Sequence, residues 1–195
     1  MMASSALIEE AARVFCEDAL TDYRAARDKA AGRLGLSLRD ARAEVADIQA
    51  AVIRYQQLFG GRAYIERLAH LRQTAVKAMN LLADFEPRLV GAVISGAITE
   101  SHRVQLHAFA DKPETLDLLL EDRRIPFEVG ERHYRYGDGR EIDVAVLSFG
   151  DGEMGVDVAV FSERDVRRAP LSSVDQAPMK RLTLSEVEKL AAQDV

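Results

Sequence analysis

The stretch Pro126–Phe161, PFEVGERHYRYGDGREIDVAVLSFGDGEMGVDVAVF, decides the fold class. It holds three runs rich in β-branched and aromatic residues, 126–136, 141–149 and 154–161, which are typical of strands. Two Gly-Asp-Gly sequences, at 137–139 and 150–152, separate the runs, and glycine supplies the positive φ that tight hairpins need. The stretch therefore predicts three strands joined by two hairpins.

Shorter apolar runs precede this stretch, at Leu89–Ser95 and Val104–Ala110, and each predicts a further strand. Asp111 followed by Glu114 resembles a capping box that opens a helix through Leu120. The segment around Pro170 and Pro178 is irregular in pattern. A C-terminal helix follows, which Thr183 caps with Glu186 three residues further on.

The sequence before Pro87 contains no proline and is rich in Ala, Leu, Arg and Glu, which favours helices. Four helices are predicted: from Ser4 or Ser5 to Cys16, from Tyr23 to Leu34 with Thr21 as cap, from Ser37 (with Asp40) to Gly60, and from Arg62 to Ala83. The last two carry apolar stripes at spacings of three and four. In the fourth helix, the stripe consists of Ile65, Leu68, Leu71, Ala75, Met79 and Leu82.

These patterns together predict an α+β protein with two domains. A helical module spans residues 1–86, and a small mixed-sheet α/β domain with a C-terminal helix spans residues 87–195. At 195 residues, 48% of them hydrophobic and 30% charged, the chain can bury a sizeable core.

Composition and charge exclude several classes of protein. No apolar run approaches the roughly 20 residues of a membrane span, and the first ten residues lack a secretory signal pattern. Cys16 is the single cysteine, so neither an internal disulfide nor a cysteine zinc site can form, and a cytoplasmic location is expected. Residues 89–195 carry 13 Lys and Arg against 20 Asp and Glu, which disfavours general nucleic-acid binding. Basic pairs such as Lys180-Arg181 are interpreted as solvated surface.

A resemblance to known proteins rests on several motifs. The whole chain resembles an uncharacterised bacterial protein family, whose shared segments are Thr21–Tyr23, Lys29–Ala31, Arg33–Gly35, Phe85–Gly91, Leu106–Asp111, Pro170–Ser172 and Pro178-Met179. Residues 88–161 also resemble a minimal nucleotidyltransferase-type domain. That resemblance implies a Gly-Ser pair after the first strand, two alternate carboxylates on the second strand, and a third carboxylate later, all serving Mg²⁺ and a nucleotide.

The matching positions depart from the active pattern. The turn is Ser95-Gly96, in reversed order, and the positions of the paired carboxylates hold Arg103 and Gln105. Arginine cannot ligate a cation, and glutamine offers only a neutral oxygen. Asp157 alone remains as a candidate third acid. The resemblance therefore implies a degenerate domain, a pseudoenzyme without a working two-metal site.

Each candidate residue also has a structural interpretation. Asp157 and Asp143 alternate with apolar neighbours, as the solvent-facing residues of a strand do. His107 lies between Leu106 and Ala108, which favours a structural histidine over a catalytic base. Arg103 either holds an anionic ligand directly or forms an ion pair with Asp157 or another strand acid.

Some members of the resembled family carry the designation of a Mur-type ATP-dependent ligase. Such ligases need a glycine-rich loop ending in Gly-Lys-Ser or Gly-Lys-Thr, and no Gly-Lys pair occurs in this sequence.

The leading functional hypothesis is a non-catalytic module that binds a nucleotide or a protein partner, with Ser95, Gly96, Arg103, Gln105 and Asp157 as its binding residues and no metal or cofactor. One alternative is a divergent active nucleotidyltransferase that uses Mg²⁺, a nucleotide and a remodelled site. His107 and Asp157, with Asp111 or Asp143, would then be catalytic. A second alternative is a structural homo-oligomer held through the helical module.

Overall fold

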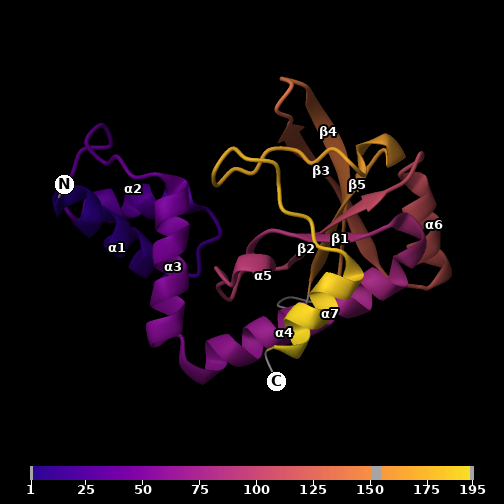
Figure 1. The fold of residues 1–195 in the computed structure, drawn as a ribbon, viewed down its shortest axis with the longest axis horizontal. Helices are drawn as coiled ribbons and strands as arrows, with labels where there is room; N and C mark the ends of the chain where they lie inside the picture. The colour runs from indigo at the N-terminus through magenta and orange to yellow at the C-terminus, as the bar shows by residue number, and fades with distance from the viewer. Residues whose placement is uncertain (1, 151–154, 194–195) are drawn as a thin grey trace. The chain divides into compact units, whose positions relative to one another are not determined.

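The computed structural model describes residues 2–150 and 155–193, and side chains from residue 5 onward. It is an α+β fold in which helices precede a five-stranded mixed sheet, as the sequence predicts (Figure 1). Contacts divide the chain into two compact units. The first consists of residues 1–67, 95–102 and 173–175, and the second of residues 68–94, 103–172 and 176–195.

Three helices form the core of the first unit: α1 (Met2–Glu17), α2 (Tyr23–Arg33) and α3 (Val45–Phe59). Figure 1 shows them in indigo to purple, packed as neighbours. Alanines on α2 allow the close approach, because Ala26, Ala30 and Ala31 are fully buried against the other two helices. The ring of Phe15 stacks on Tyr23 with the centroids 4.6 Å apart. On α3, Ile48 and Val52 of the predicted apolar stripe are buried, whereas Phe59 at its end is 70% exposed.

Two helix starts differ from the prediction. Asp22, and not Thr21, is the N-cap of α2, since its side chain accepts a hydrogen bond from the Arg24 N–H. Ser37 and Asp40 do bond to one another, but α3 begins only at Val45. The predicted contact between Ser37 and Asp40 therefore forms, but residues 41–44 have no regular structure and the helix starts only after them.

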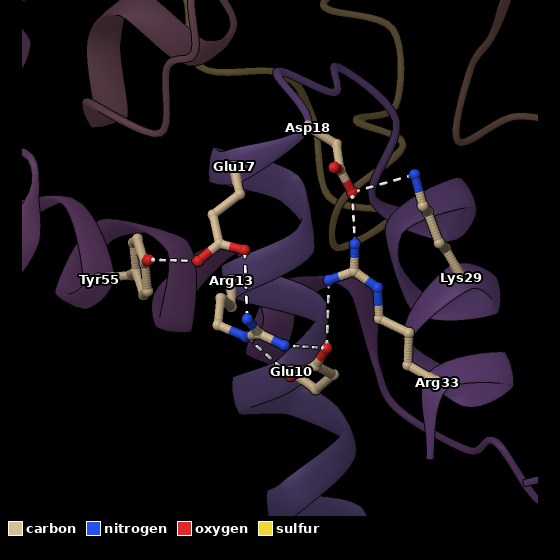
Figure 2. Close-up of polar contacts among 7 residues, drawn as sticks. All are labelled: Glu10, Arg13, Glu17, Asp18, Lys29, Arg33 and Tyr55. Carbon is tan, nitrogen blue, oxygen red and sulfur yellow. Dashed lines mark hydrogen bonds and ion pairs between the residues drawn. The ribbon is translucent and has the colours of Figure 1, made fainter. Parts of the chain in front are cut away.

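An ion-pair network ties α1 to its neighbours (Figure 2). Arg33 of α2 reaches both Glu10 (3.3 Å) and Asp18 (3.2 Å), and Lys29 also contacts Asp18. The hydrogen bond from Arg13 lowers the pKa of Glu10. On the other side, the Tyr55 hydroxyl of α3 donates to Glu17. These polar contacts link α1 to α2 and α3 at partly exposed positions beside the alanine-rich interface.

Arg33→Gln should lower the free energy of unfolding by less than about 1 kcal/mol, because its partners are partly exposed and water screens the pairs. Arg24→Gln on the same helix is the matched control, since Arg24 forms no ion pair within the described part of the chain. The difference should shrink when chemical denaturation is repeated in 1 M salt, where the Debye length is about 3 Å. Equal stabilities of the two variants in low salt would contradict the network's contribution.

The helix α4 (Gly61–Leu81) begins in the first unit and continues into the second. Leu68, Leu71, Ala75 and Met79 of the predicted stripe are buried, but Ile65 is 57% exposed. The short strand β1 (Arg88–Val90) follows, and a single helical turn, α5 (Ala92–Ser95), takes the place of the rest of the predicted strand.

The sheet of the second unit has the order β1-β2-β5-β4-β3. Its other strands are β2 (Val104–Phe109), β3 (Phe127–Arg135), β4 (Glu141–Phe149) and β5 (Val156–Phe161). The central pair, β2 and β5, is parallel, and all other neighbours are antiparallel. The turn at Gly137–Gly139 joins β3 to β4 as predicted. Residues 151 and 152 of the second predicted turn, and Met154, where the last strand was predicted to start, lie outside the described residues.

Two helices of the second unit accompany the sheet. The helix α6 (Glu114–Asp122) begins after Pro113 without a side-chain cap, so the predicted Asp111 box is absent. The helix α7 (Leu184–Ala192) carries the predicted capping box of Thr183 and Glu186. Just before it, Leu182 forms a two-way backbone bridge with Leu89 of β1. This bridge fixes the segment that carries Arg181 relative to the sheet edge.

Candidate functional site

Strand register places two predicted residues, Gln105 and Asp157, in one row with Ser148 across the second unit's sheet. Gln105 of β2 lies opposite Asp157 of β5, and Asp157 lies opposite Ser148 of β4. All three side chains are half-buried and share one face, because side chains alternate along each strand. His107 lies two residues further along β2 on the same face. We call this surface, consisting of Arg103, Gln105, His107, Ser148 and Asp157, the polar sheet face.

Asp157 is neutralised within this face. The Arg103 Nε donates to Asp157 Oδ1 at 2.9 Å, and the Ser148 hydroxyl donates to the same oxygen at 2.9 Å. The guanidinium also reaches the Phe149 carbonyl oxygen at 3.2 Å. A Cβ built on Gly155 would overlap the guanidinium, so the glycine gives Arg103 its room. The ion pair expected under the structural interpretation of Arg103 is therefore present.

This donor set does not fit a divalent metal. A two-metal site needs carboxylates that converge, whereas here the single carboxylate already accepts two hydrogen bonds and pairs with a cation. Within residues 2–150 and 155–193, no three His, Cys, Asp or Glu side chains gather as metal ligands would. Asp143 lies on the opposite face of β4, where it contacts the exposed His133 at 2.8 Å. Asp143 and Asp157 therefore lie on opposite faces of the sheet.

His107 is 1% exposed and is held by Arg181, a residue predicted from its sequence context to lie on the solvated surface. The Arg181 Nε donates to His107 Nδ1 at 3.0 Å. Because arginine can only donate, Nδ1 is the acceptor and the neutral ring carries its proton on Nε2. Burial, reinforced by the Arg181 charge, lowers the pKa of His107 well below its ordinary value. A neutral imidazole with its basic nitrogen occupied is a poor general base.

Arg181 also organises the chain that follows β5. Its Nη1 donates to the carbonyl oxygens of Asp165 (2.8 Å) and Arg168 (3.1 Å). The guanidinium lies over the rings of Phe109 and Phe161, 5.0 and 5.2 Å from the centroids. Nothing in the local pattern around Lys180-Arg181 signals this, because the partners are remote in sequence.

Two buried donors of this cluster lack an acceptor. Neither His107 Nε2 nor Arg181 Nη2 has a hydrogen-bond partner within the described structure, although both atoms are buried. An unsatisfied buried donor costs about 1–3 kcal/mol, so such atoms mark places where water or a ligand oxygen is expected. The hydroxyl of Tyr136 is the third buried polar atom of this kind. Burial raises the pKa of Tyr136 to about 12, so it remains a neutral donor.

Ser95 and Gly96 belong to the first unit and are not part of the polar sheet face as described. The Ser95 hydroxyl accepts a hydrogen bond from the Ala97 N–H at 3.3 Å. Gly96 has a φ of +82°, and its carbonyl oxygen accepts from the Tyr64 hydroxyl at 2.9 Å. Their visible role is to shape the 95–102 loop.

The first unit contains a cavity of about 290 Å³ between α1, α3, the start of α4 and this loop. Its polar lining holds the loop: Gln56 donates to the Ile98 carbonyl oxygen, and Arg67 donates to those of Thr99, Glu100 and His102. Cys16 also lines it, and burial raises the pKa of that thiol to about 12, so the thiol stays protonated. The lining therefore offers no activated nucleophile.

The helices offer no membrane span: in the part of the chain that the structure describes, none is long and apolar enough to cross a bilayer. Comparison with known proteins finds no matching family model, and neither a curated protein nor a solved structure is similar to this chain at a significant level.

Proposed function

We propose that the chain is a non-catalytic binding module that holds a nucleotide, or a partner protein presenting a similar anionic group, on the polar sheet face. Two buried donors on this side of the sheet, His107 Nε2 and Arg181 Nη2, support it most, because neither has an acceptor within the described structure. The resemblance to nucleotidyltransferases adds that Arg103 stands where active members carry a carboxylate, although its charge is already paired with Asp157. A guanidinium supports recognition of a phosphate or carboxylate without metal, whereas it works against nucleotidyl transfer.

The charge environment supports the same proposal. His107 Nε2 and Arg181 Nη2 are buried donors that an anionic oxygen would satisfy. Arg132 of β3 also faces this side of the sheet, since it lies opposite Val144 and two positions from Tyr134. The divergent-enzyme alternative gains no such support, because Asp157, His107 and Asp143 are each engaged by a different partner.

Two assays test the proposal. We expect no transfer of a nucleoside monophosphate to the protein, RNA or a small acceptor with Mg²⁺ or Mn²⁺. We also expect calorimetry to detect ATP or GTP binding in EDTA. Arg103→Met should weaken that binding at least about tenfold, because a hydrogen bond to a charged group is worth about 1.5–3 kcal/mol.

Arg135→Met is the matched control. Arg135 belongs to β3, is exposed and pairs with Glu141 at 3.2 Å, so its loss should leave nucleotide affinity unchanged. Melting curves of both variants would show that each still folds. Labelled adenylylation that Asp157→Asn abolishes would overturn the non-catalytic assignment. Absence of nucleotide binding at millimolar concentration would remove the nucleotide as ligand and make Arg103 purely structural.

A further inference from the structure

The outer strand β3 leaves most of one side of its backbone unpaired; at its end, the Arg135 carbonyl oxygen accepts a hydrogen bond from the Leu171 N–H at 2.7 Å. Strand β3 is the last strand in the order β1-β2-β5-β4-β3, and nine of its residues pair with β4 on the inner side. Residues 128–131 are exposed, and the Val129 side chain is 64% exposed. A long, regular edge with free N–H and C=O groups is a template for another strand.

The charges on β3 fall into two groups. His133 and Arg135 are paired with Asp143 and Glu141 of β4. Glu128 and Arg132 form no ion pair with any residue that the structure describes. Both lie on the same face of the strand, two positions to either side of Gly130. Glu131, on the other face, is also unpaired among the described residues, so the face of Glu128 carries one uncompensated anion and one uncompensated cation, placed symmetrically about a glycine.

Symmetry limits how two copies of this edge can pair. Antiparallel strands of identical chains are related by a two-fold axis perpendicular to the sheet, so opposite residues share a face and the axis passes through one residue. An axis at Glu131 would place two carboxylates opposite each other, and one at Arg132 would oppose two guanidinium groups. An axis at Gly130 instead places Glu128 of each copy opposite Arg132 of the other.

Gly130 also suits the centre of such a pairing. A Cβ added there would meet only the Val146 carbonyl oxygen, at 4.0 Å, so the space above the residue is open. With two glycines opposite each other, the long side chains of Glu128 and Arg132 can approach their partners across the axis without a central obstruction. In this register, Glu128 and Arg132 of each copy both gain an ion pair with the other copy.

We propose that β3 is the docking surface for a second copy of this chain, which adds antiparallel to it about Gly130 and continues the sheet across both copies. Two cross-strand ion pairs, between Glu128 of each copy and Arg132 of the other, specify the register. This interface does not involve the helical module, but Arg132 also faces the side of the sheet on which the ligand is proposed.

Charge reversal tests the proposal by analytical ultracentrifugation of the full chain, from about 1 μM to 1 mM, the range in which weak dimers dissociate. We expect a monomer–dimer equilibrium. Glu128→Arg and Arg132→Glu should each weaken the dimer about tenfold or more, because each change turns two attractive cross-strand pairs into repulsive ones. The double variant Glu128→Arg/Arg132→Glu restores opposite charges and should recover the dimer.

Glu131→Arg is the matched control, since Glu131 lies on the other face and opposes Val129 of the second copy in this register. It should leave the dimer unchanged. Hydrogen exchange should also slow in β3 amides as the protein concentration rises. A chain that stays monomeric throughout, a dimer indifferent to the single reversals, or a double variant that fails to recover would each overturn the proposal. Nucleotide binding by the parent protein, measured over the same concentration range, reports separately on the polar sheet face.

Discussion

Leu71→Ala is expected to lower the free energy of unfolding by about 2–5 kcal/mol, the cost of a leucine-sized cavity in a packed core. Leu71 lies in the middle of α4 and is fully buried, with Ala75 and Met79 buried one and two turns further on. Alanine preserves helix propensity, so the loss arises from packing alone. Urea denaturation followed by circular dichroism measures it.

Ile65→Ala is the control on the same helix. Ile65 belongs to the same apolar stripe in sequence but is 57% exposed, so its truncation should change stability by no more than about 0.5 kcal/mol. A Leu71→Ala variant that melts within a degree of the parent would show that this face of α4 is not packed. Similar losses in both variants would show that Ile65 is covered in solution.

Acid should destabilise the first unit through His102. The ring is 8% exposed, and burial, reinforced by the Arg67 charge, lowers its pKa from 6.5 to about 4. Below pH 6.5 the unfolded chain takes up a proton that the folded chain refuses until about pH 4. Stability therefore falls as the pH drops through this window, by about 3 kcal/mol in all, at about 1.4 kcal/mol per pKa unit.

His102→Asn isolates this contribution. His102 Nδ1 accepts the Thr99 N–H at 2.9 Å, and an asparagine side-chain oxygen can take over that bond without titrating. Chemical denaturation at pH 7, 6, 5 and 4.5 should give a clearly flatter stability profile for the variant. The lowered pKa of the buried His107 also makes stability fall with pH, and the His102→Asn variant retains that contribution. Identical profiles for parent and variant would contradict a neutral, buried His102.

Local patterns were sufficient to predict the elements whose determinants lie close in sequence. The alternation around Val144 and Val158 gave the strands, and the capping box of Thr183 and Glu186 formed as predicted. The Gly137–Gly139 turn could be predicted for the same reason, because the residues of the turn itself determine a hairpin.

Features that depend on partners remote in the sequence could not be predicted. The apolar run at Leu89–Ser95 splits into a strand and a helical turn, because β1 pairs along only three residues. Arg181 looked like surface charge, since its acceptor His107 is remote in sequence. For Arg103, the sequence left a ligand contact and an ion pair open, and only the strand register brings Asp157 beside it.

The parallel pairing of β2 with β5 has a consequence for how the chain acquires its structure. Val104 pairs with Val156, so the contacts between the two central strands form only when a loop of about fifty residues closes. On the ribosome, β1 and β2 emerge long before their central partner is synthesised. The hairpin of β3 and β4 can form first, as a local unit, but it has nothing to dock on until β5 follows. Folding of this unit is therefore expected to be slow and late in synthesis, with Arg181 closing over His107 as one of the last events.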